Sequence, residues 1–173
     1  MIREGIAIGK PVSPQNRAQV PVGPGFTPGR PGPELPERKR IRLSEARYRG
    51  PHSYFLTLCT DGRAAAFRQA DRVAQALAVL QKCADSYLFD IWAYCFMPDH
   101  LHLLVGAREE GSNLLAFMRA LKQRSGYLFR SRQRLWQKNY YDHILRAGDS
   151  WESVARYIWM NPVRKGLCDR PED

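Results

Sequence analysis

The sequence predicts an α+β protein built on an antiparallel sheet with helices packed on one face. Segments of β-favouring residues alternate with segments of helical period, in the order β-α-β-β-α-β followed by a helix. Two of the strands are joined by a link too short for a crossover, which requires them to run antiparallel. These observations favour a single globular unit.

The first strand and helix are predicted from residues 53–60 and 69–85. The strand segment is rich in aromatic and β-favouring residues and ends at the turn sequence Asp61-Gly62. The helical segment carries apolar residues at helical spacing, with charged residues outside them. These apolar residues are Val73, Leu77, Leu80 and Ala84.

Two further strands are predicted at residues 87–96 and 100–106. Only Met97-Pro98-Asp99 separates them, and this link has the composition of a tight turn. We therefore expect the two strands to form a β-hairpin.

A second helix is predicted to begin at Ser112 or Asn113, either of which can cap it, and to run to about Arg130. A short strand near residues 140–145 follows it. The apolar stripe of this helix consists of Leu114, Leu115, Met118, Leu121 and Leu128.

The last predicted helix begins at Asp149 and ends at Asn161-Pro162. Glu152 stands at the capping-box position relative to Asp149. Proline closes the helix because its ring and its missing N–H do not fit a helix interior.

Residues 1–42 differ in composition from the globular segment, which we place at residues 43–173. Eight of the twelve prolines lie within the first 36 positions, together with six glycines. Such a segment buries too little apolar surface to offset its ordering entropy, so we expect a disordered tail. It ends in the basic run at 38–42, which is either a solvated linker or an arm that lies along phosphates.

The net charge of +10 and the isoelectric point near 9.8 favour a polyanionic partner, whether nucleic acid or an acidic membrane surface. The four cysteines lack CxxC spacing, so we expect reduced thiols in a cytoplasmic protein. No apolar stretch reaches the roughly 18–20 residues that span a bilayer. The N-terminus also lacks the apolar core of a secretory signal. We therefore expect a soluble, intracellular protein without a membrane partner.

Two histidines, His100 and His102, lie within the predicted strand 100–106. Residues two apart on a strand project from one face, with their roots about 6–7 Å apart. Two neutral imidazoles at that separation can converge on one divalent ion. The same pattern also fits two buried histidines that only pack and form hydrogen bonds.

A tyrosine and an amide, Tyr157 and Asn161, lie four residues apart on one face of the last predicted helix. A tyrosine hydroxyl has a pKa of about 10 and needs a cation or base to act as a nucleophile at neutral pH. Bound Mg²⁺ or Mn²⁺ would assist attack on a phosphodiester, with the Asn161 amide oxygen as a further ligand. The pair also fits a core residue and a C-cap, and Tyr127, Tyr140 and Tyr141 are rival hydroxyls.

Four stretches of the chain resemble a known family, in the order in which that family has them. The resemblance is to the IS200-type single-tyrosine transposases, and most closely to their REP-associated branch, and it covers about residues 47–169. The stretches are YFLTLCTDGR at 54–63, AYCFMPDHLHLL at 93–104, LWQKNYYDHILR at 135–146 and YIWMNPVRKGL at 157–167.

The resemblance implies a ferredoxin-like nuclease fold of the HUH (His-hydrophobic-His) class with a C-terminal helix that carries the tyrosine. It implies that His100, His102 and Asn161 bind Mg²⁺ or Mn²⁺ and that Tyr157 is the nucleophile. The implied reaction is cleavage of single-stranded DNA to a 5′-phosphotyrosine and a free 3′-OH, followed by strand transfer. The implied substrates are hairpins of repetitive extragenic palindromes (REP), bound by a monomer or homodimer in the cytoplasm, at the nucleoid.

Residues 111–141 fit a DNA partner because they contain no acidic residue and interleave cations with aromatic residues. Cations bind phosphates, and aromatic side chains stack on unpaired bases. The alternative is a solvated basic face over a core of aromatic side chains. The predicted DNA contacts are Arg119, Lys122, Arg124, Arg130, Arg132, Arg134, Trp136, Gln137 and Lys138.

Two other functions fit the same residues. The first is a catalytically idle protein that binds DNA or RNA hairpins. The second is a metal-dependent phosphodiesterase that acts on RNA with water as the nucleophile, in which case Tyr157 is dispensable.

Overall fold

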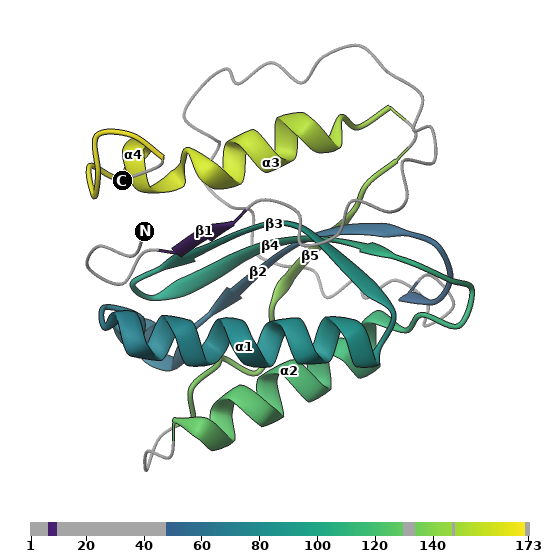
Figure 1. Ribbon diagram of the computed structural model, residues 1–173, viewed down its shortest axis with the longest axis horizontal. Helices are drawn as coiled ribbons and strands as arrows, with labels where there is room; N and C mark the ends of the chain where they lie inside the picture. The colour runs from purple at the N-terminus through teal and green to yellow at the C-terminus, as the bar shows by residue number, and fades with distance from the viewer. Residues whose placement is uncertain (1–6, 10–47, 130–133, 147, 172–173) are drawn as a thin grey trace.

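The computed structural model describes residues 7–9, 48–129, 134–146 and 148–171. Its centre is a five-stranded antiparallel sheet with the strand order β1-β3-β4-β2-β5 (Figure 1). The strands are β1 (Ala7–Gly9), β2 (Ser53–Cys59), β3 (Phe89–Met97), β4 (His100–Ala107) and β5 (Tyr141–Ile144).

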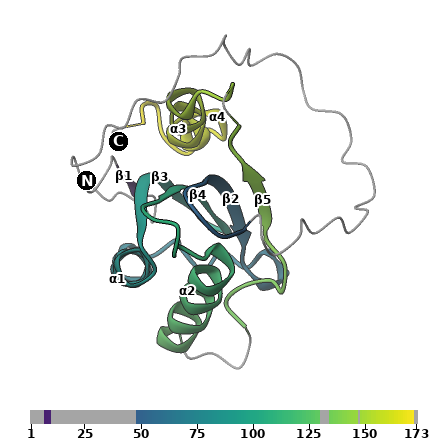
Figure 2. The same cartoon turned by 90° about the vertical axis from the view of Figure 1, so that its right-hand side faces the viewer.

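The helices lie on both faces of this sheet. Helices α1 (Ala70–Ser86) and α2 (Leu114–Leu128) cover one face, and α3 (Trp151–Trp159) with the short α4 (Asn161–Arg164) covers the other (Figure 2). A short 3-10 turn, Asp61–Arg63, follows β2. The predicted order of elements from residue 48 onward is confirmed. The C-terminal helix α3 packs on the face of the sheet opposite α1 and α2. None of the helices described is long and apolar enough to cross a membrane.

The alternation of side chains along the strands divides the core into two clusters. Leu56, Phe96 and Leu103 pack with α1 and α2. Ala93 and Leu104 point the other way and pack beneath α3. Residues that pair directly across antiparallel strands share a face. Thr57 and His102 are such a pair, so the histidines lie on the α3 face of the sheet.

The β3–β4 hairpin confirms the predicted turn, with Met97 paired to His100 and only Pro98 and Asp99 between them. The register of this pair shifts between Ile91 and Ala93, where Trp92 forms a β-bulge. The bulge matters for packing because the Trp92 indole lies against Gly106 on the neighbouring strand.

The start of α3 differs from the prediction. Ser150, and not Asp149, is the N-cap, and its hydroxyl oxygen accepts a hydrogen bond from the Ser153 N–H at 3.1 Å. The Asp149 carboxylate instead accepts the Arg146 N–H at 2.8 Å and lies 3.3 Å from His143 Nε2. It therefore closes the loop before the helix.

The expectation of disorder over residues 1–42 is wrong for Ala7–Gly9, which pair with residues 94–96 of β3 as an edge strand. The open edge of β3 offers unpaired backbone groups, and three residues suffice to pair with some of them. The basic run at 38–42 lies outside the described residues.

Candidate active site

The two histidines of β4 face each other at the hairpin end of the strand. His100 Nε2 and His102 Nε2 are 3.1 Å apart, and the two ring planes are nearly perpendicular, at 88°. His102 is buried and His100 is half-buried. The period of a strand brings the two side chains to one face, as predicted.

Asp99, in the hairpin turn, binds the other ring nitrogen of His100, with Asp99 Oδ1 2.6 Å from His100 Nδ1. Its second oxygen lies 3.2 Å from the Arg63 guanidinium. Burial acts to raise the pKa of Asp99, but the His100 hydrogen bond and the charges of His100 and Arg63 outweigh it and hold that pKa below its usual range. Asp99 therefore stays ionised and fixes the ring of His100.

Thr57 on β2 performs the corresponding role for His102, with Thr57 Oγ1 3.0 Å from His102 Nδ1. The His102 ring is also stacked on Phe55, with 5.8 Å between centroids. Burial, with the nearby charges of His100 and Arg63, lowers the pKa of His102 to about 3. His102 is therefore neutral at physiological pH, the form in which histidine binds a metal.

If both rings are neutral, these hydrogen bonds allow one assignment of protons in the metal-free site. His100 Nδ1–H donates to Asp99, so its Nε2 is an acceptor for His102 Nε2–H. His102 Nδ1 then accepts the hydroxyl proton of Thr57. If a metal takes the place of the proton between the two rings, the Thr57 hydroxyl can turn and accept from His102 Nδ1–H instead. A hydroxyl serves both states because it can donate and accept.

Tyr157 reaches the same region from α3. Its ring makes edge contacts with Phe55, at 6.0 Å, and with His102, at 6.2 Å between centroids. The Asn161 amide nitrogen donates to the Tyr157 carbonyl at 2.8 Å and lies 3.4 Å from the Ile158 carbonyl. The amide is thus oriented by the end of α3, as the C-cap interpretation expects, and its oxygen is the atom left for a ligand.

Among the rival hydroxyls, one also lies on this face. Tyr141 of β5 is paired with Thr57, contacts Phe55 at 6.1 Å and is 45% exposed. Tyr127 belongs to α2, and Tyr140 packs beside the Lys122 ammonium on the α1–α2 side of the sheet. The arrangement therefore leaves two tyrosines, Tyr157 and Tyr141, near the histidine pair.

The histidine pair fits a divalent ion. Two neighbouring ligand positions about 2.1 Å from an octahedral ion are about 3 Å apart, close to the 3.1 Å between the two Nε2 atoms. Within the described ranges, no group of three or more His, Cys, Asp or Glu side chains gathers to hold a metal. Any further ligand of an ion held there would therefore be an amide or hydroxyl oxygen, water or a substrate oxygen.

Trp136 corrects the prediction of a DNA contact. Its side chain is 5% exposed and stacks near Phe67 in the α1–α2 core, with the indole N–H donating to Ser125 Oγ at 2.8 Å. The cause is a pairing between distant parts of the chain. Trp136 forms a β-bridge with Thr60, and the Gln137 N–H donates to the Cys59 carbonyl at 2.9 Å. The indole is therefore unavailable for stacking on bases.

Lys122 also differs from the prediction. Its ammonium donates to the carbonyls of Gln137 and Lys138, at 2.6 Å and 2.8 Å, and burial lowers its pKa. The side chain therefore ties α2 to the segment after Trp136. Gln137 itself is half-buried.

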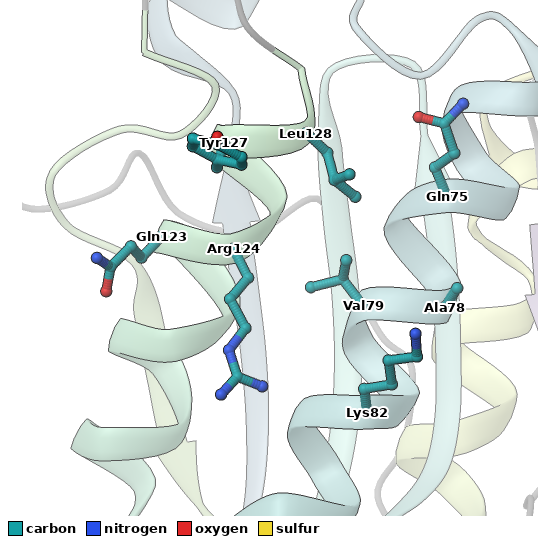
Figure 3. Close-up of a pocket in the computed structure, with 8 residues that line it drawn as sticks. All are labelled: Gln75, Ala78, Val79, Lys82, Gln123, Arg124, Tyr127 and Leu128. Atoms are coloured by element: carbon teal, nitrogen blue, oxygen red, sulfur yellow. The ribbon is translucent and has the colours of Figure 1, made fainter.

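The other predicted DNA contacts fall into three groups. Arg119, Arg134 and Lys138 are exposed. Arg124 borders a shallow groove of about 640 Å³ between α1 and α2, together with Lys82 and the exposed Tyr127 (Figure 3). The groove lies on the sheet face opposite the histidines. Arg130 and Arg132 lie outside the described residues.

Sequence reasoning missed four residues that surround the histidines and Tyr157. Phe55 and Thr57 share a face because they are two apart on β2, and that alternation was visible in the sequence. The register that pairs Thr57 on β2 with His102 on β4 could not be predicted from the sequence. Asp99 precedes His100 directly, which was a usable signal, whereas the contact of Arg63 with Asp99 depends on tertiary folding.

The fold is of the α+β class, and on one face of its sheet two facing histidines lie beside the ring of Tyr157. A family model described as "Transposase IS200 like" matches residues 50–161, which include both histidines and Tyr157. The chain belongs to this family of DNA-cleaving tyrosine transposases.

Individual relatives agree with this assignment. One is a Haemophilus influenzae protein whose name places it among the REP-associated tyrosine transposases; it is 25% identical over 133 residues, covering 69% of this chain and 75% of its own. The REP-associated tyrosine transposase of Escherichia coli is 24% identical over 85 residues, covering 49% and 51%. The solved structure of a REP-associated tyrosine transposase bound to a REP hairpin has the same fold, with a TM-score of 0.66, 18% identity and 78% of each chain covered.

Proposed function

We propose that this chain is a metal-dependent endonuclease and strand transferase that acts on single-stranded DNA at REP-type hairpins. The proposed nucleophile is Tyr157, and the proposed metal ligands are His100, His102 and Asn161. The observation that carries this proposal is the pair of facing imidazoles, 3.1 Å apart, beside the ring of Tyr157.

The reaction exchanges one ester bond of the scissile phosphate for another. The Tyr157 oxygen attacks phosphorus, the bond from phosphorus to the 3′-oxygen breaks, and the products are a 5′-phosphotyrosine and a free 3′-OH. The phenolic proton is balanced by the proton that the 3′-oxygen takes up. A bound Mg²⁺ or Mn²⁺ would offset the charge on the phosphate oxygens. Because the ester conserves the energy of the broken bond, attack by another 3′-OH can rejoin the strand without a nucleotide cofactor.

The site supports this reaction through the placement of its side chains. Asp99 and Thr57 hold the two imidazoles with their Nε2 atoms facing each other, which lowers the entropy lost when a metal binds. Phe55 contacts both His102 and Tyr157, so one ring packs against a proposed metal ligand and against the proposed nucleophile.

A hairpin substrate is proposed from the charge of the chain and from the relatives. The net charge of +10 provides an electrostatic attraction to DNA. The exposed cations Arg119, Arg124, Arg134 and Lys138 are the proposed phosphate contacts. Two relatives are named for REP association, and the solved relative is bound to a REP hairpin.

The test is a cleavage assay with REP-type hairpins that carry short single-stranded flanks, labelled at the 5′ or the 3′ end. With Mg²⁺ or Mn²⁺, we expect the 3′-labelled fragment to become linked to protein and the 5′-labelled fragment to end in a free 3′-OH. EDTA and the Tyr157→Phe variant should both abolish the adduct, whereas Tyr141→Phe, the matched control on the same face, should retain it.

Other outcomes would favour the alternatives. Tight hairpin binding without an adduct in either metal would indicate an idle binding protein. Metal-dependent cleavage of RNA that survives Tyr157→Phe would indicate a phosphodiesterase that uses water.

A further inference from the structure

Arg164 lies over the ring of Tyr157. Its guanidinium carbon is 5.2 Å from the ring centroid, and Phe55 contacts the same ring by its edge at 6.0 Å. Tyr157 is therefore held between an aromatic ring from β2 and a cation from α4. Arg164 has no role in the reaction described above.

The end of α3 and the turn of α4 together place Arg164 there. The Asn161 side chain donates to the Tyr157 carbonyl, and the Arg164 N–H donates to the Met160 carbonyl at 3.0 Å. Lys165 N–H then donates to the Asn161 carbonyl at 3.1 Å. Residues 157 and 164 are seven apart, which is about two helical turns, so their side chains share one side of the α3–α4 segment.

The guanidinium of Arg164 is exposed, and in the described part of the chain it forms no ion pair with a carboxylate. Its hydrogen-bond donors are therefore open to a ligand that approaches the Tyr157 ring. A guanidinium binds two oxygens of a phosphate with parallel hydrogen bonds. It also attracts the face of a tyrosine ring, and this attraction grows as the phenolic oxygen gains negative charge.

We propose that Arg164 binds the phosphodiester that Tyr157 attacks and, through its stacking on the ring, positions Tyr157 for that attack. This inference rests on the proposed function. As the bond from the Tyr157 oxygen to phosphorus forms and the bond to the 3′-oxygen breaks, negative charge on the phosphate oxygens is stabilised by the guanidinium. The role requires parallel hydrogen-bond donors for the phosphate and a planar group that stacks on the ring. A lysine at this position should therefore support only part of the rate.

The test is single-turnover formation of the covalent adduct on a REP-type hairpin, over a range of protein concentrations. Arg164→Gln should lower the maximal rate by about 10- to 100-fold, with hairpin affinity changed by no more than about threefold. Arg164→Lys should recover part of the rate. Millimolar guanidinium chloride should partly restore the rate of Arg164→Ala, an effect that a merely structural role would not produce.

Lys165→Gln is the matched control, because Lys165 is the next residue and is also exposed, whereas the cation over the Tyr157 ring is Arg164. It should keep the wild-type maximal rate. The inference is overturned if Arg164→Gln forms adduct at the wild-type rate, or if Lys165→Gln slows it as much. Absence of any adduct with the wild-type protein would instead overturn the proposed function, and this inference with it.

Discussion

Thr57 Oγ1 lies 3.0 Å from His102 Nδ1, and the two residues are direct partners across β2 and β4. The pairing fixes a buried imidazole that has its other nitrogen 3.1 Å from His100. The hydroxyl is thus the part of the site that determines which His102 nitrogen is free for a metal.

The first prediction follows from this contact. Thr57→Val keeps the shape of the side chain but removes the hydroxyl, so His102 Nδ1 loses its partner. Metal affinity should fall by about 10- to 100-fold, measured by titration calorimetry with Mn²⁺. Thr57→Ser, which keeps the hydroxyl, should bind within about threefold of the wild type. Equal affinities for all three proteins would show that Thr57 does not orient His102.

The second prediction concerns the acid stability of the metal-free protein. The pKa of buried His102 is about 3, below the roughly 6.5 of histidine in an unfolded chain. Unfolding therefore takes up a proton between these values, and the stabilisation is complete above about pH 6.5 and declines as the pH falls toward 3. The slope is about 1.4 kcal/mol per pH unit for one such proton.

The measurement is urea denaturation at several pH values in EDTA. His102→Gln removes the titrating group, so its free energy of unfolding should fall less steeply than that of the wild type between pH 6 and pH 4. Parallel curves for the two proteins would mean that His102 takes up no proton on unfolding.

The third prediction separates the core residue from the DNA contact in the segment after α2. Trp136→Phe loses the hydrogen bond to Ser125 and part of its packing with Phe67, so it should lower the free energy of unfolding by about 1–3 kcal/mol. Hairpin affinity of the folded variant should stay unchanged. Lys138→Gln should instead keep the wild-type free energy of unfolding and weaken hairpin binding. The slope of log binding constant against log salt concentration should become shallower by about 1.

The fourth prediction concerns the close packing of Trp92 on β4. A Cβ at Gly106 would lie 2.2 Å from Trp92 Cζ2 and 2.7 Å from Cε2, which requires the indole or the bulge to move. Gly106→Ala should therefore destabilise the fold by about 1–3 kcal/mol in chemical denaturation. Gly126→Ala is the control. It lies within α2 with open space around it and should stabilise by up to about 1 kcal/mol.

The sequence was sufficient for the features that depend on local period. The hairpin around Pro98 and the shared face of His100 and His102 both follow from alternation along a strand and from turn composition. Ser112 and Asn113 were both predicted as possible caps of α2, and the structure selects Asn113, whose side-chain oxygen accepts a hydrogen bond from the Ala116 N–H.

Features that depend on the pairing of distant segments could not be predicted in this way. Nothing local to Trp136 indicates that Thr60 pairs with it, so sequence reasoning predicts a DNA contact for this tryptophan, which precedes Gln137 and Lys138. The position of Tyr157 above Phe55 depends on which face of the sheet α3 covers, and helical period alone does not define that face.

The most direct test of the account is to find which residue carries DNA after reaction with a REP-type hairpin. Trypsin separates the candidates, because Tyr157 lies in the peptide 157–164, Tyr140 and Tyr141 in 139–146, and Tyr127 in 125–130. After nuclease digestion of the adduct, mass spectrometry should find the remaining nucleotide on peptide 157–164, with fragment ions that place it on Tyr157. Nucleotide on peptide 139–146 or 125–130, with 157–164 unmodified, would contradict the assignment of Tyr157 as the nucleophile.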